Sequence, residues 1–100
     1  MATFAVTMEH GPRWDASRGI REQDGFGEHA AFMDSLVDDG FVILGGPLDD
    51  GQPLLAVDAT DEAQLRVRLA ADPWAPMGLL HIGSVRRWEL WLDGRTAAAR

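Results

Sequence analysis

The chain has 100 residues, 46% of them hydrophobic and 25% charged, and its formal net charge is −7. These totals indicate one soluble globular domain. The acidic balance and the lack of Lys argue against nucleic acid as a partner, because a binder needs cations that neutralise phosphates. No cysteine, no signal peptide and no apolar run of about 20 residues is present, so we expect a cytoplasmic protein that does not enter a membrane.

The first predicted elements are a strand, a long loop and a helix. Phe4, Val6 and Met8 alternate with less apolar residues, which predicts a strand over residues 4–9. No periodicity follows in residues 10–23, and a loop of this length is either a lid or binding loop, or a mobile surface excursion. Helical periodicity then covers residues 26–39, with Asp24 as the expected N-cap and Gly40 as the stop.

A hairpin, a second helix and a long strand complete the pattern. Residues 41–45 and 54–57 read as antiparallel strands, joined by a corner at residues 45–47 and a turn at residues 49–51. Thr60 is the expected cap of the second helix, which must end near Asp72 because Pro73 follows. Alternation predicts a final strand over residues 79–92, with a bulge at Gly83, and residues 95–100 read as a frayed tail.

The element order is βαββαβ, which predicts an α+β ferredoxin-like fold: an antiparallel sheet with two helices on one face. Right-handed crossovers then bring His10, His29, His81 and Asp72 to one end of the domain. Helical spacing also puts His29 on the apolar face of its helix. This gathering predicts a candidate site at that end.

Asp72 is unusual because a carboxylate after a helix C-terminus faces the negative end of the helix dipole. Within hydrogen-bond reach of His29, it would fix the tautomer of the imidazole and leave the other ring nitrogen to transfer a proton. Two structural alternatives remain open. Asp72 could cap the turn at Pro73, and His29 could be a core histidine bonded to a carbonyl. A metal site of the three histidines and Asp72 has no supporting local spacing, so we expect none.

The open face of such a sheet needs a cover. If the last strand is regular, Trp88 and Trp91 point to opposite faces, and the helices cannot cover both. We therefore expect a homodimer through the open sheet face. A partly exposed Trp at the sheet edge is the alternative.

Several of these residues together resemble the YciI-like (YCII-related) domain family. They are His29 in the first helix, Gly40 followed by a strand into Gly46, Pro47 and Leu48, the strand at residues 54–57, and residues 71–74 ahead of Gly78 and Leu79. The resemblance covers nearly the whole chain, from Phe4 to about Trp91. We therefore expect one domain of this kind over residues 1–94 and a C-terminal tail over residues 95–100. It implies a dimeric α+β barrel with a characteristic histidine and aspartate, matched here by His29 and Asp72. An arginine often found shortly before that histidine is replaced here by residues 25–28.

Topology and resemblance together predict a small enzyme that needs no cofactor. His29 and Asp72 would transfer protons on a small organic substrate, such as an aromatic or lactone-like compound, in a lyase, isomerase or dehalogenase reaction. The residues expected to contact this substrate are Gly46, Pro47, Trp74, His81 and His10. The alternative is a non-catalytic dimeric module that binds a small ligand or a partner.

Overall fold

The computed structural model describes residues 1–97 as an α+β domain. Its strands and main helices follow the predicted order, and two short helical segments are added. The elements are β1 (Ala2–His10), η1 (Ile20–Glu22), α1 (Phe26–Asp38), β2 (Val42–Pro47), β3 (Pro53–Ala59), α2 (Glu62–Ala70), β4 (Leu80–Arg87) and α3 (Gly94–Ala97).

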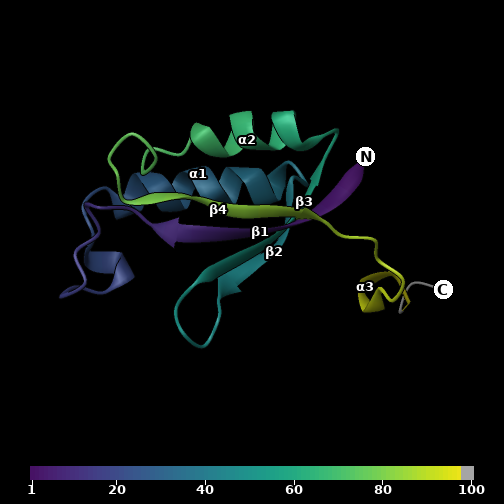
Figure 1. Cartoon of the computed structure of the whole chain (residues 1–100), viewed down its shortest axis with the longest axis horizontal. Coiled ribbons are helices and arrows are strands. Elements are labelled where there is room, and N and C mark those ends of the chain that lie inside the picture. Colours follow the sequence, from purple (N-terminus) through teal and green to yellow (C-terminus); the bar gives the residue numbers. More distant parts are fainter. Residues whose placement is uncertain (98–100) are drawn as a thin grey trace.

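The four strands form one antiparallel sheet in the order β2-β3-β1-β4. Helices α1 and α2 lie on the same side of this sheet (Figure 1), an arrangement compatible with the predicted ferredoxin-like fold. His10 at the end of β1 is paired with Leu80 at the start of β4. The chain segments that leave β1 and enter β4 therefore lie together, and the N–H of Gly11 donates to the carbonyl of Leu79 at 2.9 Å. The candidate site lies at this end of the sheet, where β1 ends and β4 begins.

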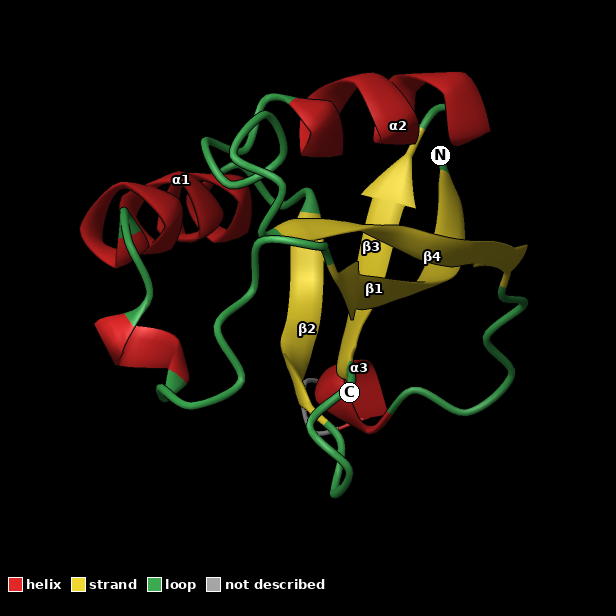
Figure 2. Cartoon of the chain, turned by 60° about the vertical axis from the view of Figure 1, so that its left-hand side comes forward, coloured by secondary structure: helices red, strands yellow, loops and turns green. Residues whose placement is uncertain are grey.

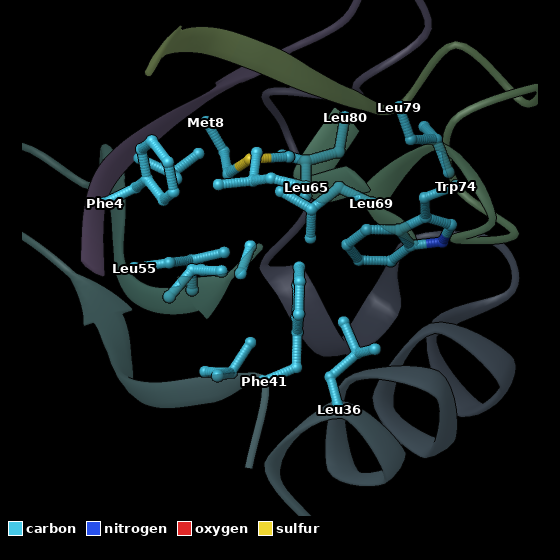
Figure 3. Close-up of a cluster of buried hydrophobic side chains, with 14 residues drawn as sticks. Phe4, Met8, Leu36, Phe41, Leu55, Leu65, Leu69, Trp74, Leu79 and Leu80 are labelled. Carbon is cyan, nitrogen blue, oxygen red and sulfur yellow. The ribbon is translucent and has the colours of Figure 1, made fainter. Parts of the chain in front are cut away.

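The core fills the space between the sheet and the two helices (Figure 3). Alternate residues of β1 and β3 point into it, as the period of two requires. Helix α2 contributes Leu65 and Leu69, four residues apart, whereas Val67 on its other side is 72% exposed. Full burial of one such side chain stabilises the fold by about 1.5–3 kcal/mol. Trp74, which follows α2, is also completely buried in this cluster.

The caps of both helices differ from the prediction. The N-cap of α1 is Gly25 at φ 72°, a left-handed conformation, and Asp24 instead uses its carbonyl to accept a hydrogen bond from the Trp74 indole at 2.7 Å. The N-cap of α2 is Asp61, whose carboxylate accepts from the Gln64 N–H at 2.8 Å. Gly40 does end α1, at φ 76°, as expected.

The predicted corner at residues 45–47 is wrong, because these residues extend β2. They pair in register with Leu55, Leu54 and Pro53 of β3. A Cβ at Gly45 would lie 2.6 Å from the Leu55 side chain, so glycine here allows the two strands to pack closely. The chain turns only after Pro47, over the predicted turn, where Gly51 has a φ of 89°.

The last strand is shorter than predicted. The bulge at Gly83 is confirmed, since Thr7 pairs with Ser84 and Met8 with Ile82. However, β4 ends at Arg87, which is paired with Phe4. The N–H of Trp88 makes one further hydrogen bond, to the carbonyl of Thr3 at 2.9 Å, and only two residues of β1, Ala2 and Thr3, lie beyond Phe4. The expectation that residues 88–92 alternate across the sheet is therefore wrong.

The segment after β4 leaves the sheet toward the side away from α2, where α3 lies (Figure 2). Trp88, Leu90 and Leu92 share a small cavity there with Leu44 and Ala56 of the sheet. Of the predicted tail, residues 95–97 belong to α3, and residues 98–100 lie outside the described part of the chain.

Candidate active site

His29 lies in the second turn of α1 and points into the domain. Its N–H donates to the carbonyl of Gly25 at 3.1 Å, so the left-handed glycine that starts the helix also fixes the turn that carries the imidazole. His29 and Leu36 are the buried residues of this helix, seven positions apart, and therefore share one face. The whole His29 residue is 8% exposed.

Asp72 follows the end of α2 and is 4% exposed. Its two carboxylate oxygens lie 2.8 Å and 3.0 Å from Nδ1 of His29. Oδ1 also accepts a hydrogen bond from the backbone N–H of Trp74 at 2.9 Å. These contacts offset the unfavourable position of a carboxylate at the negative end of the α2 dipole. Asp72 thus both contacts the histidine and caps the Pro73 turn, so the two roles separated by sequence reasoning occur together.

This contact assigns the tautomer of His29. An ionised carboxylate can only accept hydrogen bonds, so Nδ1 carries a hydrogen, and in the neutral imidazole Nε2 then keeps its lone pair. Within residues 1–97, no protein group hydrogen-bonds Nε2. The ring is therefore arranged to accept a proton at Nε2 while Asp72 stabilises the positive charge that results.

The indole of Trp74 fixes the plane of this ring. The Trp74 and His29 rings are stacked, with centroids 3.8 Å apart and planes inclined by 6°. Trp74 is itself completely buried, and its Nε1 donates to the carbonyl of Asp24. With Asp72 on its nitrogen and Trp74 on its face, His29 has little freedom to rotate.

A second stacked pair continues from Trp74. The Trp14 ring meets Trp74 edge-on, at 5.7 Å between centroids, and the His10 ring is stacked on Trp14 at 3.7 Å with planes inclined by 6°. The four rings form a row that joins β1, the loop after it, α1 and the turn after α2. Sequence reasoning did not identify Trp14, although an aromatic residue in a loop that lacks periodicity was a signal that could have been used.

His29 opens onto a cavity of about 470 Å³ between the helices and the sheet. This volume is within the range of small-molecule sites. The cavity also contacts Asp72 and His10, and most of its remaining lining is apolar, including Met8, Ile20, Met33, Val37, Val42, Leu55, Leu69 and Leu80. Such a lining favours a ligand with little charge, because a buried ion without a partner is strongly disfavoured.

The residues predicted to contact a substrate fall into three places. His10, Gly46 and Pro47 line the same cavity as His29. Trp74 is covered completely and reaches the site only through its stack on His29. His81 is exposed and points, with Glu9, to the opposite face of the sheet, where its Nε2 lies 3.7 Å from a Glu9 oxygen. The structure thus does not bring His81 to the cavity.

The loop after β1 closes one side of the cavity and is held by a buried glutamine. Gln23 is 3% exposed, and its amide donates to the carbonyls of Asp15, Arg18 and Gly19 while its oxygen accepts the N–H of Asp15. Arg18, Gly19 and Ile20 line the cavity. The loop predicted as either a lid or a mobile excursion is therefore anchored over the site.

The charges of this loop pair with one another. The guanidinium of Arg18 lies 3.1 Å from Asp15 and 3.6 Å from Asp24. Hydrogen bonds from the hydroxyl and the backbone N–H of Ser17 lower the pKa of Asp15, and Arg18 lowers it further. Arg18 is thus partly neutralised at the edge of the cavity, in keeping with an uncharged ligand.

Two further observations concern the described residues 1–97. No group of three or more His, Asp or Glu side chains is arranged to hold a metal ion. No helix in this part of the chain has the length and apolar character needed to cross a bilayer.

Comparison of the chain with models of protein families, with curated proteins and with solved structures gave no match.

Proposed function

We propose that the protein is a small enzyme that transfers protons on an uncharged organic substrate by means of His29 and Asp72. One observation carries the proposal: Nδ1 of His29 contacts a buried carboxylate, while the same imidazole lines an apolar cavity. A positioned base of this kind contributes about 10²–10⁴-fold to a rate. The chemistry needs no cofactor, and it fits an isomerase, lyase or dehalogenase acting on an aromatic or lactone-like compound.

The resemblance to the YciI-like family is part of this proposal. The features that carried it, His29 in the first helix and Asp72 after the second, lie 2.8 Å apart at Nδ1 and Oδ2. The strand order is also that of a ferredoxin-like subunit. These two agreements support membership in that family. The absence of cysteine fits the reducing cytoplasm as the location.

In the proposed reaction, Nε2 of His29 removes a proton from a carbon or oxygen of the substrate. The imidazolium that forms is stabilised by the Asp72 carboxylate and by the face of Trp74. The apolar lining excludes water, which strengthens both interactions. The electron pair left on the substrate then expels a leaving group or moves a double bond.

The test replaces His29 by Gln, which fills similar space but cannot accept and release a proton. Neutral phenols, α-angelica lactone and a β,γ-unsaturated cyclohexenone serve as probes of thermal stabilisation. The lactone and the cyclohexenone then also serve as probes of hydrogen exchange in heavy water at the carbon beside the carbonyl. We expect the wild-type protein to exchange at least one probe and His29→Gln to lose about 10²-fold or more of that rate. The same change at His81, which lies outside the cavity, provides the matched control. Equal rates in wild type and His29→Gln would refute the proposal.

A non-catalytic ligand-binding module is the second candidate, and the size and apolar lining of the cavity favour it. It predicts that probes raise the melting temperature of wild type and His29→Gln alike and that neither protein exchanges their hydrogens. The same experiment therefore separates the two functions.

We also propose that the domain is a homodimer through its open sheet face, as in a dimeric α+β barrel. The residues after β4 support this, since Trp91 is 84% exposed and Leu92 93% exposed beside that face. Apolar side chains gathered at one surface indicate an interface. Light scattering after size exclusion should give twice the mass of the 10.9 kDa chain. Trp91→Ser should shift the equilibrium toward the monomer, and a wild-type monomer at all concentrations would refute the dimer.

A further inference from the structure

A base held in one orientation can return a proton only to substrate atoms within reach of its nitrogen. His29 is held by Asp72 at Nδ1 and by the Trp74 face, so its Nε2 addresses one region of the cavity. Reactions that move a double bond need a proton removed at one carbon and delivered at another. A second donor on another wall of the cavity would meet this need.

His10 occupies such a position. It is the last residue of β1 and lies on the same face of the strand as Met8, two residues earlier, so its side chain is directed to the side of the sheet that bears the helices. It lines the cavity that His29 lines. Between the two imidazoles stand the indoles of Trp14 and Trp74, so the histidines belong to different walls.

The surroundings of His10 suit a group that exchanges protons with water. Its ring is fixed by the stack on Trp14, yet the residue is exposed, in contrast to His29. No hydrogen bond joins its ring to any of residues 1–97, so both nitrogens are available to substrate and solvent. Imidazole is the side chain best suited to gain and lose a proton near neutral pH.

The other charged groups that line the cavity do not fill this role. Asp72 is engaged by His29 and Trp74, and Arg18 is paired with Asp15. A guanidinium group does not deliver protons in proteins. Asp34 lies on α1 beside Met33 and is a carboxylate that could accept but not deliver a proton while ionised.

We infer that His10 is a second catalytic residue, which delivers a proton to the substrate after His29 has removed one, and that the substrate is an uncharged β,γ-unsaturated carbonyl compound. The inference rests on the proposed function of His29. Nε2 of His29 takes the proton from the carbon beside the carbonyl, and the C–H electron pair forms a conjugated enolate. The far carbon of the double bond then takes a proton from the His10 imidazolium. The double bond moves into conjugation, and His10 regains its proton from water as His29 releases one.

The experiment follows two hydrogens of α-angelica lactone and of the β,γ-unsaturated cyclohexenone in heavy water by NMR. Exchange beside the carbonyl reports His29, and deuterium at the far carbon of the conjugated product reports His10. We expect wild type to do both. His10→Gln should lose about 10²-fold or more of product formation, and a much smaller fraction of the exchange beside the carbonyl. His10→Ala should lose product formation to a similar extent. Added imidazole should restore product formation in this variant, because it can occupy the space beside Trp14.

Thermal melting and probe binding of the variants guard against a loss that reflects misfolding. If both variants form product at the wild-type rate, His10 has no catalytic role and the function of His29 stands. Loss of both exchange and product in His10→Gln, with probe binding and melting unchanged, would also overturn the separate role. If wild type exchanges neither probe while His29→Gln behaves the same, the proton-transfer function and the role of His10 fall together.

Discussion

Asp72→Asn is the substitution that tests the tautomer argument most directly. Asparagine has the shape of aspartate, and its oxygen in the place of Oδ1 still accepts the Trp74 N–H. Its NH₂ group then takes the place of Oδ2, 2.8 Å from Nδ1 of His29. A donor in that position requires Nδ1 to accept, so the hydrogen must move to Nε2. The ring loses the lone pair with which it would remove a proton.

The expected loss of stability follows from the replacement of a hydrogen bond to a charged carboxylate by a neutral one. A hydrogen bond to a charged group contributes about 1.5–3 kcal/mol and a neutral one about 0.5–1.5 kcal/mol, so the variant should lose about 1–2 kcal/mol of unfolding free energy. For a domain of this size, that corresponds to a melting temperature lower by roughly 4–16 °C. Proton transfer should fall by about 10²–10⁴-fold, a far larger effect than the loss of stability.

Two assays separate these effects for Asp72→Asn. Nitrogen NMR of the imidazole reports which ring nitrogen of His29 carries the hydrogen, and heavy-water exchange of α-angelica lactone reports proton transfer. We expect the hydrogen on Nδ1 in wild type and on Nε2 in the variant. A variant that retains the hydrogen on Nδ1 and exchanges the probe at the wild-type rate would refute the reasoning from donors and acceptors.

Three further outcomes are expected. Gln23→Ala removes four hydrogen bonds from the loop over the cavity, so amides of residues 15–23 should lose hydrogen-exchange protection while the melting temperature changes less. Leu65→Ala should cost about 2–5 kcal/mol in denaturant unfolding, and exposed Val67→Ala should stay within about 0.5 kcal/mol. Because the pKa of Asp15 is lowered in the folded state, the hydrogen bonds from Ser17 stabilise the fold at pH values above the unfolded-state pKa of about 3.9. This stabilisation is lost as the pH falls through the lower pKa of the folded state. NMR titration of Asp15 should show the lowered pKa, and Ser17→Ala should raise it.

Element order and topology were predictable because they depend on strong local signals. Alternation along β1, the stop at Gly40 and the proline after Asp72 each act over a few residues. Together with crossover handedness, they place His29 and Asp72 at one end of the domain, where the two side chains are in contact. The general position of the pair needed no detail of side-chain packing.

The errors lie where long-range partners decide the outcome. Residues 45–47 read as a turn because of their two glycines, yet pairing with β3 keeps them in the sheet. Residues 88–92 alternate like a strand, yet pairing with β1 ends at Arg87, and β1 has only two residues beyond that pair. Local composition is a weak guide when the deciding hydrogen bonds come from a strand elsewhere in the sequence.

The row of four rings could not be predicted from the sequence, because its contacts join residues that lie far apart in the chain. This row also joins the site to the core. Trp74 packs among the buried leucines on one side and stacks on His29 on the other, so the plane of the proposed base is set by the hydrophobic core. Trp14 and His10 extend the row into the loop, which is held by hydrogen bonds and few buried side chains. Local opening of that loop would therefore free His10 while leaving His29 in place. The fold thus permits a substrate to enter beside His10 without disturbing the base at the far wall.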